Sequence, residues 1–273
     1  MATPIGNLGD VTRRAVETLG ACDVVLAEDT RRTRQLLTHL GIAGKQVQRF
    51  DAHASDADVE RVLAKLSEGA NVAIVTDAGT PGVSDPGEKL VEAAVVAGVK
   101  VVPIPGASAV LAALAASGLA GDGRFRFLGF LPRSGTERRE AIVTVCATPE
   151  TVVLYEAPNR VQATMRDLAD ATPDRLACIA RELTKLHEEL LRGTCASLAD
   201  DAREWIGEIA IVLGPHEPQT RAETIDDAAL DARIDEAIDR GEHARAASER
   251  LAAWSGRSKR DIYERYIGRK ASR

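Results

Sequence analysis

The chain has 273 residues, of which 45% are hydrophobic and 28% charged, so it is long enough for two compact domains with a small appendage. Only 3% of the residues are aromatic, so its cores must consist mainly of Ala, Val, Leu and Ile. The formal net charge of −6 excludes a general polyanion binder, and nucleic-acid contact would need local basic patches.

The cysteines and the hydropathy pattern indicate the cellular compartment of the protein. Four cysteines are scattered without a C-x-x-C pair and five histidines are dispersed, so we expect no metal site and no disulfide framework. No apolar run reaches about 18 residues and no signal peptide is visible, so we expect no membrane span. These features predict a cytoplasmic protein with reduced thiols.

The chain opens with a Gly/Pro loop, ATPIGNLGD, at residues 2–10. A loop of this type should follow an apolar strand, and almost nothing precedes it. Either the first strand is very short or the start codon has been assigned too late, and we favour the second. A helix at residues 11–19, a strand at 23–27 and a helix at 31–40 follow.

The next stretch, VTDAGTPGVSDPG, begins at Val75 and is the most informative part of the chain. An apolar run at residues 71–75 predicts a buried strand that ends in this loop. Ligands of open parallel sheets bind just beyond the carboxyl ends of strands, which is where Asp77 is placed. Glycines allow close backbone approach, and Pro81 and Pro86 stiffen the loop.

The same order recurs at residues 99–119, where an apolar strand leads into PIPGAS and an Ala/Leu-rich helix that Ser108 is placed to cap. Helices at 59–69 and 88–97 complete a βαβ alternation, which implies a mostly parallel sheet. Three Gly/Pro loops after three strands are hard to explain as connections alone. They predict a small-molecule cleft.

The composition changes to Gly and Asp at residues 118–123, where we place a boundary between domains 1–118 and 119–216. In the second domain, FRFLGFLP, TVVLYE, RLACIARELT and IGEIAIVLG predict strands. Helices are expected at 137–146 and 160–168. This pattern predicts a second α/β domain with some antiparallel pairing.

A linker, HEPQTRAET, is expected at residues 216–224, and three short helical patterns separated by glycines fill residues 225–270. The pattern is typical of a helix-turn-helix module, although a helical tail packed on the main body fits equally well. The end of the chain, after Trp254, is locally basic. We expect truncation after about Thr220 to leave the rest folded. The expected core residues of the module are Ala246, Ala247, Leu251, Ile262 and Tyr266.

Charged residues follow the predicted strands. In AEDTRRT, Glu28 and Asp29 end a strand, and helix capping is a fair alternative for Asp29. Arg31 and Arg32 lie at the wrong end of the helix dipole, which indicates a site for phosphate.

A second arginine cluster lies in FLPRSGTERR, with Arg133, Arg138 and Arg139 around a Ser-Gly turn. Because the guanidinium presents a planar donor fork to phosphate, we favour a contact with a nucleic-acid backbone over a solvated loop.

Two further strand ends carry polar groups, ARELTK with Arg181, Glu182 and Lys185, and TVVLYE with Tyr155. Polar groups that converge on one cleft are typical of an active site, although internal ion pairs alone are the alternative. The chain has no Walker A, G-x-G-x-x-G or G-x-S-x-G motif, so a nicotinamide cofactor is not expected.

Eight motifs occur in a fixed order: TPIGNLGD, AEDTRRT, VTDAGTPGVSDPG, PIPGASA, GFLP, YEAPNR, ARELTK and GEIAIVLG. Together they resemble the bacterial ribosomal RNA small subunit methyltransferase I family of the tetrapyrrole-methylase superfamily, over nearly the whole chain. The resemblance implies two α/β domains of the tetrapyrrole-methylase type, S-adenosylmethionine in the cleft between them, a C-terminal helical module and a homodimer. Asn159 stands where the family usually has His, which puts in doubt any role of a His there.

The resemblance further implies methylation of a ribose 2′-hydroxyl of a cytidine in the decoding region of 16S rRNA, on the small ribosomal subunit, with no DNA or membrane partner. Methyl transfer needs alignment above all, and a positioned base helps to remove the hydroxyl proton. Candidate bases are Glu28, Asp29, Asp77, Glu182 and Lys185, of which Lys185 would need a pKa lowered by burial.

Binding residues are expected in two groups. Those expected to hold the cofactor are Pro4, Asp77, Ala78, Gly79, Thr80, Ser108, Ala109, Tyr155 and Arg181. Those expected to contact RNA are Arg31, Arg32, Arg133, Arg138, Arg139, Arg257, Lys259 and Arg260.

Two alternatives stay open. The same fold could methylate a tetrapyrrole, although a small macrocycle needs neither the arginine-rich loops nor the C-terminal helices. The protein could also be a non-catalytic RNA-binding module that uses the cofactor only structurally. A methylation assay on purified 30S subunits with labelled cofactor separates all three.

Overall fold

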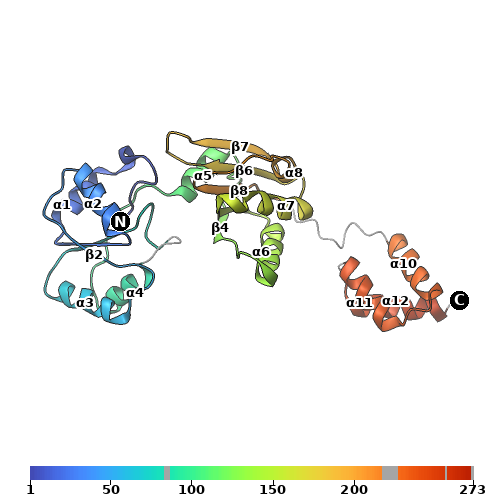
Figure 1. Cartoon of the computed structure of the whole chain (residues 1–273). Coiled ribbons are helices and arrows are strands. Elements are labelled where there is room, and N and C mark those ends of the chain that lie inside the picture. Colours follow the sequence, from blue (N-terminus) through green and yellow to red (C-terminus); the bar gives the residue numbers. More distant parts are fainter. Residues whose placement is uncertain (83–86, 217–226, 256, 272–273) are drawn as a thin grey trace. The chain divides into compact units, whose positions relative to one another are not determined.

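The computed structural model describes residues 1–82, 87–216, 227–255 and 257–271 (Figure 1). The chain divides into two compact units, Met1–His216 and Glu217–Arg273. No helix in these described ranges is long and apolar enough to cross a membrane. Three expected features lie outside the described residues, namely Pro86, the linker at 217–224 and the side chain of Trp254.

The N-terminal part of unit Met1–His216 contains a small parallel sheet with helices around it. Its strands are β1 (Val24–Ala27), β2 (Gln46–Arg49) and β3 (Val72–Val75), and its helices are η1 (Leu8–Asp10), α1 (Arg13–Ala21), α2 (Thr30–His39), α3 (Asp56–Ser67) and α4 (Glu88–Val96). The strand order is β2-β1-β3, with both pairings parallel as expected. β1 is buried along its whole length because apolar side chains cover both faces of the sheet.

Local signals explain most boundaries of this part and one failure. Helix α3 begins before the expected residue 59 because Ser55 and Asp58 form a capping box. Strand β2 was not expected, since its sequence QVQR is largely polar. The strand expected between Val99 and the PIPGAS loop is wrong: residues 99–102 have no regular secondary structure, and in the loop that follows the Ile104 carbonyl accepts a hydrogen bond from the amide of Ala2 at 3.0 Å.

The C-terminal part of the same unit contains a five-stranded mixed sheet in the order β4-β5-β8-β6-β7. Its elements are α5 (Ala109–Ser117), β4 (Phe125–Phe130), α6 (Gly135–Ala147), β5 (Thr151–Glu156), η2 (Pro158–Arg160), α7 (Val161–Ala171), β6 (Leu176–Arg181), β7 (Glu189–Thr194), α8 (Cys195–Ala199) and β8 (Ile209–Leu213). β4 and β5 pair in parallel, and the other pairs are antiparallel, which confirms the expected antiparallel pairing. Strand β7 was not expected.

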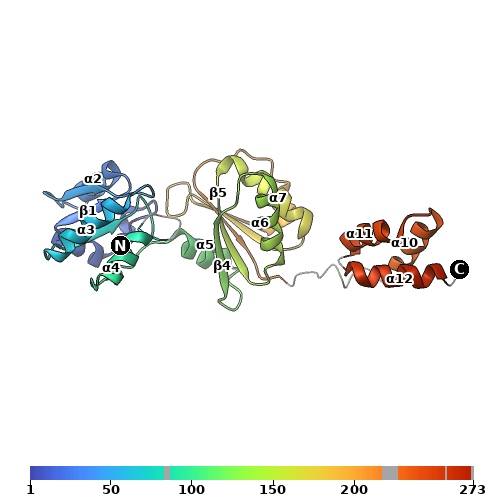
Figure 2. The same cartoon turned by 90° about the horizontal axis from the view of Figure 1, so that it is seen from below.

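Helix α5 covers one face of this sheet and α6 and α7 cover the other (Figure 2). Val110 and Ala113 of α5 pack with Ala210 and Val212 of β8. The boundary expected after residue 118 grouped α5 with the first sheet, whereas its apolar side chains complete the core of the second. Both sheets carry helices, so the structure shows the expected mixed α/β architecture.

The second unit contains α10 (Asp227–Asp239), α11 (Ala244–Ser255) and α12 (Lys259–Ala271), which share one apolar core. The expected core residues Ala247, Leu251, Ile262 and Tyr266 lie in it. Ala246 is exposed, so its placement in the core was wrong. The remaining core side chains, which the sequence reasoning did not name, are Leu230, Ile234 and Ala237.

Candidate active site

A cavity of about 420 Å³ lies in unit Met1–His216, and its lining comes from loops of both sheets. Its volume falls within the range of about 300–1,000 Å³ that is usual for small-molecule and cofactor sites. The cavity is called the cleft below. The expected residues that line it are Ala78, Gly79, Thr80, Ser108, Ala109 and Tyr155.

The three Gly/Pro loops meet at this cleft. Thr3 and Gly79 exchange two backbone hydrogen bonds, from the amide of Thr3 at 2.9 Å and from that of Gly79 at 3.1 Å. Gly79 has a φ of +84°, which a side chain would disfavour. The hydroxyl of Thr80 donates to the carbonyl of Ala107 at 3.3 Å and so ties the second loop to the third.

The N-terminus of α5 forms one side of the cleft. The hydroxyl of Ser108 accepts a hydrogen bond from the amide of Leu111 at 3.5 Å, as expected for an N-cap. Ser108 and Ala109 line the cleft directly. Free amides and the positive end of the helix dipole at this point favour a polar or anionic part of a ligand.

Aromatic side chains form another wall. Tyr155 packs edge-on against Phe127, with ring centroids 4.9 Å apart, and against Phe130 at 5.5 Å. Tyr155 and Phe130 line the cleft, while Phe130 also remains largely exposed. An exposed phenylalanine at the edge of a cavity offers apolar surface to whatever enters it.

Asp77 and Pro4 do not line the cleft. Both line a neighbouring cavity of about 230 Å³, together with Arg32. The carboxylate of Asp77 accepts a hydrogen bond from the amide of Asp29 at 3.0 Å and lies 3.4 Å from the guanidinium of Arg32. The strand-end position was therefore expected correctly, but the side chain faces the adjacent cavity.

Glu28 and Asp29 lie at the end of β1 and line neither cavity. The carboxylate of Asp29 caps α2, since it accepts a hydrogen bond from the amide of Arg31 at 2.7 Å. This backbone hydrogen bond lowers the pKa of Asp29 from its ordinary value. The helix-capping alternative thus accounts for Asp29.

Lys185 is engaged by two carboxylates. Its ammonium group lies 2.7 Å from Glu182 and 3.0 Å from Glu208, and the carboxylate of Glu182 also accepts a hydrogen bond from the amide of Glu208 at 2.8 Å. Burial acts to lower the pKa of Lys185, but the hydrogen bonds to Glu182 and Glu208 outweigh it, so that the pKa is raised. A general base needs the opposite shift, so this environment does not favour Lys185 as the base.

The backbone around this ion-pair cluster is unusual. Glu182 and Thr184 have positive φ values of +51° and +67°, a conformation that costs energy in residues other than glycine. Gly6 and Gly207 leave the space that this turn needs, because a Cβ atom on Gly6 would lie 2.4 Å from the Lys185 side chain and one on Gly207 would lie 2.5 Å from the carboxyl of Glu182.

A stability measurement tests the charge state of Lys185. Because its folded-state pKa is raised, its pairing stabilises the fold at pH values below its ordinary pKa of 10.5 at which Glu182 and Glu208 are ionised, and is lost as the pH rises through the folded value. We expect Lys185→Met to lower Tm by a constant amount between about pH 6 and about pH 9. Calorimetry of both proteins checks this, and a difference that shrinks in that interval would show a lowered pKa.

Arg181 and Arg138 are committed to internal contacts. Arg181 pairs with Glu189 at 3.1 Å and does not line the cleft, so its expected cofactor contact does not fit the geometry. Arg138 pairs with Asp167 at 2.7 Å, and only 13% of its side chain is exposed, which does not fit an RNA contact.

The other arginines of the two clusters that were expected to contact phosphate are exposed. Arg32 lines the smaller cavity beside Asp77, and Arg31 pairs with Asp29 at the start of α2. Arg133 has no partner among the described residues, and Arg139 contacts only the hydroxyl of Thr136.

The basic residues of the second unit are paired with acids. Arg257 lies 2.6 Å from Asp227, and Lys259 and Arg260 pair with Glu249 and Glu264. Their positive charge is therefore partly balanced, which the count of basic residues in the sequence did not reveal.

Several cleft residues escaped the sequence reasoning. These residues lie at apolar positions of the motifs ARELTK, YEAPNR and GEIAIVLG, which the sequence analysis recognised without naming these positions as site candidates. These residues are Leu183, Ala157, Pro158, Gly207, Ile209 and Ala210.

Comparisons with known proteins agree with this architecture. The family model for tetrapyrrole (corrin/porphyrin) methylases matches residues 2–199. In solved structures the fold is similar to the methyltransferase CobJ (TM-score 0.55) and to the cobalt precorrin-4 methyltransferase CbiF (TM-score 0.56). Each is 20% identical and covers 77% of this chain and 90% of that chain, so the likeness concerns the fold alone.

Curated relatives are much closer in sequence. A protein of Synechocystis sp. is 42% identical over 97% of this chain and 95% of its own length, and one of Halalkalibacterium halodurans is 40% identical over 97% and 93%. Both carry the name ribosomal RNA small subunit methyltransferase I. The chain therefore belongs to the tetrapyrrole (corrin/porphyrin) methylase family, and within it to the group of proteins named ribosomal RNA small subunit methyltransferase I.

Proposed function

We propose that this protein is an S-adenosylmethionine-dependent methyltransferase that methylates the ribose 2′-hydroxyl of a cytidine in the decoding region of 16S rRNA. The observation that carries the proposal is the cleft in which the three Gly/Pro loops and the N-terminus of α5 meet. The names of the full-length relatives support rRNA of the small subunit as the acceptor.

The lining of the cleft fits S-adenosylmethionine. Apolar side chains of Ile5, Leu183 and Ile209 offer a surface for the adenine ring and the aliphatic chain. The hydroxyls of Thr80 and Ser108 keep accepting capacity for hydroxyl and amino groups. We propose that the loop 78–80, Ser108, Ala109 and Tyr155 hold the cofactor, with Pro4 supporting the loop from the smaller cavity.

When bound, S-adenosylmethionine supplies a methyl group that is already electrophilic on a sulfonium. The protein's own task is then to align the acceptor hydroxyl and to keep water out. Tyr155 and Phe130 provide the apolar wall that excludes water. Of the candidate bases, we propose that Asp77 removes the hydroxyl proton. Asp77 directly precedes the cleft residue Ala78 in the chain, and it lines the adjacent cavity.

We propose that the acceptor strand enters over this smaller cavity. Arg32 lines it and Arg31 precedes Arg32 in α2, and both have exposed guanidinium groups, which suit phosphate. Arg133 and Arg139, at the start of α6, form the second exposed basic group of this unit.

Reversing charge at Arg133 and Arg139 tests the contact with RNA. We expect Arg133→Glu with Arg139→Glu to raise the KM for small ribosomal subunits about tenfold. The slope of the logarithm of the binding constant against the logarithm of salt concentration should become shallower by about two, since two phosphate contacts are lost. Affinity for S-adenosylmethionine should not change. Steady-state kinetics at several salt concentrations and calorimetric titration give both quantities.

The matched control reverses two exposed arginines on other helices, Arg13 and Arg61, with the same change in net charge. It should leave the KM near that of the wild type. Equal KM values for the two double variants would assign Arg133 and Arg139 to a solvated surface.

Removal of residues 217–273 tests the role of the helical unit. Because this unit has its own core, we expect the remaining Met1–His216 to fold and to bind S-adenosylmethionine normally. Activity on small subunits should fall about tenfold if the unit supplies one or two phosphate contacts. Full activity would reject an RNA role, and an insoluble product would show that the helices complete the main core.

We also propose a homodimer. The valines Val95 and Val96 of α4 and Val101 and Val102 of the next segment are exposed, which supports an apolar contact with a second copy.

A further inference from the structure

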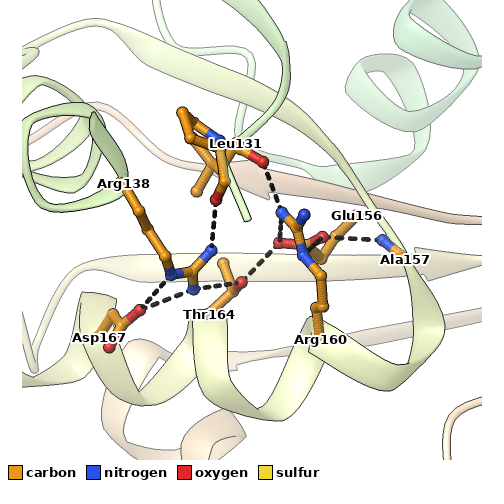
Figure 3. Close-up of polar contacts among 8 residues, drawn as sticks. Leu131, Arg138, Glu156, Ala157, Arg160, Thr164 and Asp167 are labelled. Carbon is orange, nitrogen blue, oxygen red and sulfur yellow. Dashed lines mark hydrogen bonds and ion pairs between the residues drawn. The ribbon is translucent and has the colours of Figure 1, made fainter. Parts of the chain in front are cut away.

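A polar network joins Glu156, a residue of the cleft lining, to helices α6 and α7 (Figure 3). It joins Glu156 at the end of β5, Arg160 and Thr164 at the start of α7, Arg138 of α6 and Asp167. We call these five residues the Glu156 network. Two members, Glu156 and Arg160, come from the YEAPNR motif. Arg138 is the arginine of the FLPRSGTERR cluster that is too buried for a contact with RNA.

Glu156 is the centre of the network. Its side chain is 1% exposed, and its carboxylate lies 2.8 Å from Nε of Arg160. It also accepts hydrogen bonds from the amide of Ala157 at 2.8 Å and from the hydroxyl of Thr164 at 2.5 Å. With hydrogen bonds from Ala157, Arg160 and Thr164, this buried carboxylate is engaged by internal partners, so we do not place it among the candidate bases.

Thr164 joins the two halves of the network. Its hydroxyl donates to Glu156 and accepts a hydrogen bond from the guanidinium of Arg138 at 3.0 Å. Arg138 in turn donates to Asp167 at 2.7 Å. Two arginines and two carboxylates thus alternate around one buried hydroxyl, with no net charge.

Arg160 and Arg138 both donate hydrogen bonds to the loop 130–133. Arg160 donates to the carbonyl of Leu131 at 2.6 Å, and Arg138 donates to that of Pro132 at 3.3 Å. These adjacent carbonyls lie between Phe130, which lines the cleft, and the exposed Arg133. The network therefore fixes a loop with a cleft wall at one end and a basic side chain at the other.

A buried ion-pair network is a poor source of stability, because the cost of taking the charges out of water offsets most of their attraction. What it provides is geometry, since planar guanidinium forks tolerate few orientations of their acceptors. Here the oriented element is the loop 130–133, beside the segment 156–158 of the cleft.

We infer that Glu156, Arg160, Thr164 and Arg138 are positioning residues for RNA, which hold the loop 130–133 so that Phe130 and Arg133 meet the acceptor strand at the cleft. This inference rests on the proposed function. It assigns the network to the placement of the acceptor and leaves cofactor binding to the loops at 78–80 and 108–109.

Thr164→Val tests the inference, because valine keeps nearly the same shape and removes the hydroxyl on which both halves depend. We expect the KM for small ribosomal subunits to rise about tenfold, with kcat and the Kd for S-adenosylmethionine within about twofold of the wild type. Thr164→Ser restores the hydroxyl and should restore the KM. Asp167→Asn, at the half-exposed end of the network, provides a second variant whose folding is not at risk, with a smaller rise in KM.

Arg175→Lys serves as the control for lost stability, since Arg175 is buried in the same part of the unit and contacts neither the loop nor the network. It should lower Tm without changing the KM. An unchanged KM in both Thr164→Val and Asp167→Asn would overturn the inference, as would an equal rise in the control. A wild-type protein that transfers no methyl group to subunits would instead overturn the proposed function.

Discussion

We expect Ala109→Leu to abolish methyl transfer while the protein stays folded, which is the largest functional effect expected from one substitution. Ala109 begins α5, is one of the residues that line the cleft and also packs against the adjoining apolar core. Leucine adds three heavy atoms to a cavity of about 420 Å³ whose other walls are held by backbone hydrogen bonds. We expect the Kd for S-adenosylmethionine to rise about 100-fold.

Calorimetric titration measures this change, and Ala115→Leu provides the matched control. Ala115 lies on the same helix but is exposed and does not line the cleft. The control should bind like the wild type. If Ala109→Leu also bound like the wild type, the cofactor would have to lie elsewhere.

The largest effect on stability is expected at Arg175, which is 2% exposed. Its guanidinium donates to the carbonyls of Gly214 at 2.8 Å, Val145 at 2.9 Å and Glu150 at 2.9 Å. Arg175→Met fills much of the same space but removes one donor from each of these carbonyls, of which, among the described residues, only that of Val145 is shown with a second donor, the amide of Thr148. We expect a loss of about 3 kcal/mol in the free energy of unfolding and a fall in Tm of about 6–12 °C.

Thermal unfolding of the variant and of Arg166→Met separates this effect from the loss of any arginine. Arg166 is exposed on α7, so its replacement should change the free energy of unfolding by less than about 0.5 kcal/mol. Equal Tm values for the two variants would show that the three carbonyls find other donors.

Local signals in the sequence predicted most of the helices and the buried strands. Ser108 caps α5 as expected, and the apolar run before Thr76 forms β3. Strand β2 was missed because its sequence QVQR is polar, and pairing with β1 decides its conformation. Residues 99–104 are as apolar as a strand, but a strand also needs a partner along its length, which no local pattern supplies.

The cleft could be located from the sequence, but the direction of individual side chains could not. Asp77 follows its strand as expected, yet hydrogen bonding to the amide of Asp29 turns it to the smaller cavity. Lys185 and Arg138 had the right chemistry for a base and for RNA. The nearby partner of Lys185, Glu182, is visible in the sequence, but Glu208, 23 residues from Lys185, and Asp167, 29 residues from Arg138, become partners only in the folded chain.

The most direct test of the proposed function is the position of a transferred methyl group. The purified protein is incubated with isotopically labelled S-adenosylmethionine and small ribosomal subunits that lack the modification, and 16S rRNA is then digested to nucleosides for mass spectrometry. We predict label in 2′-O-methylcytidine, within one fragment of the decoding region, and none after Ala109→Leu. Label on a base, label in another ribose, or transfer only to a tetrapyrrole would contradict the proposal.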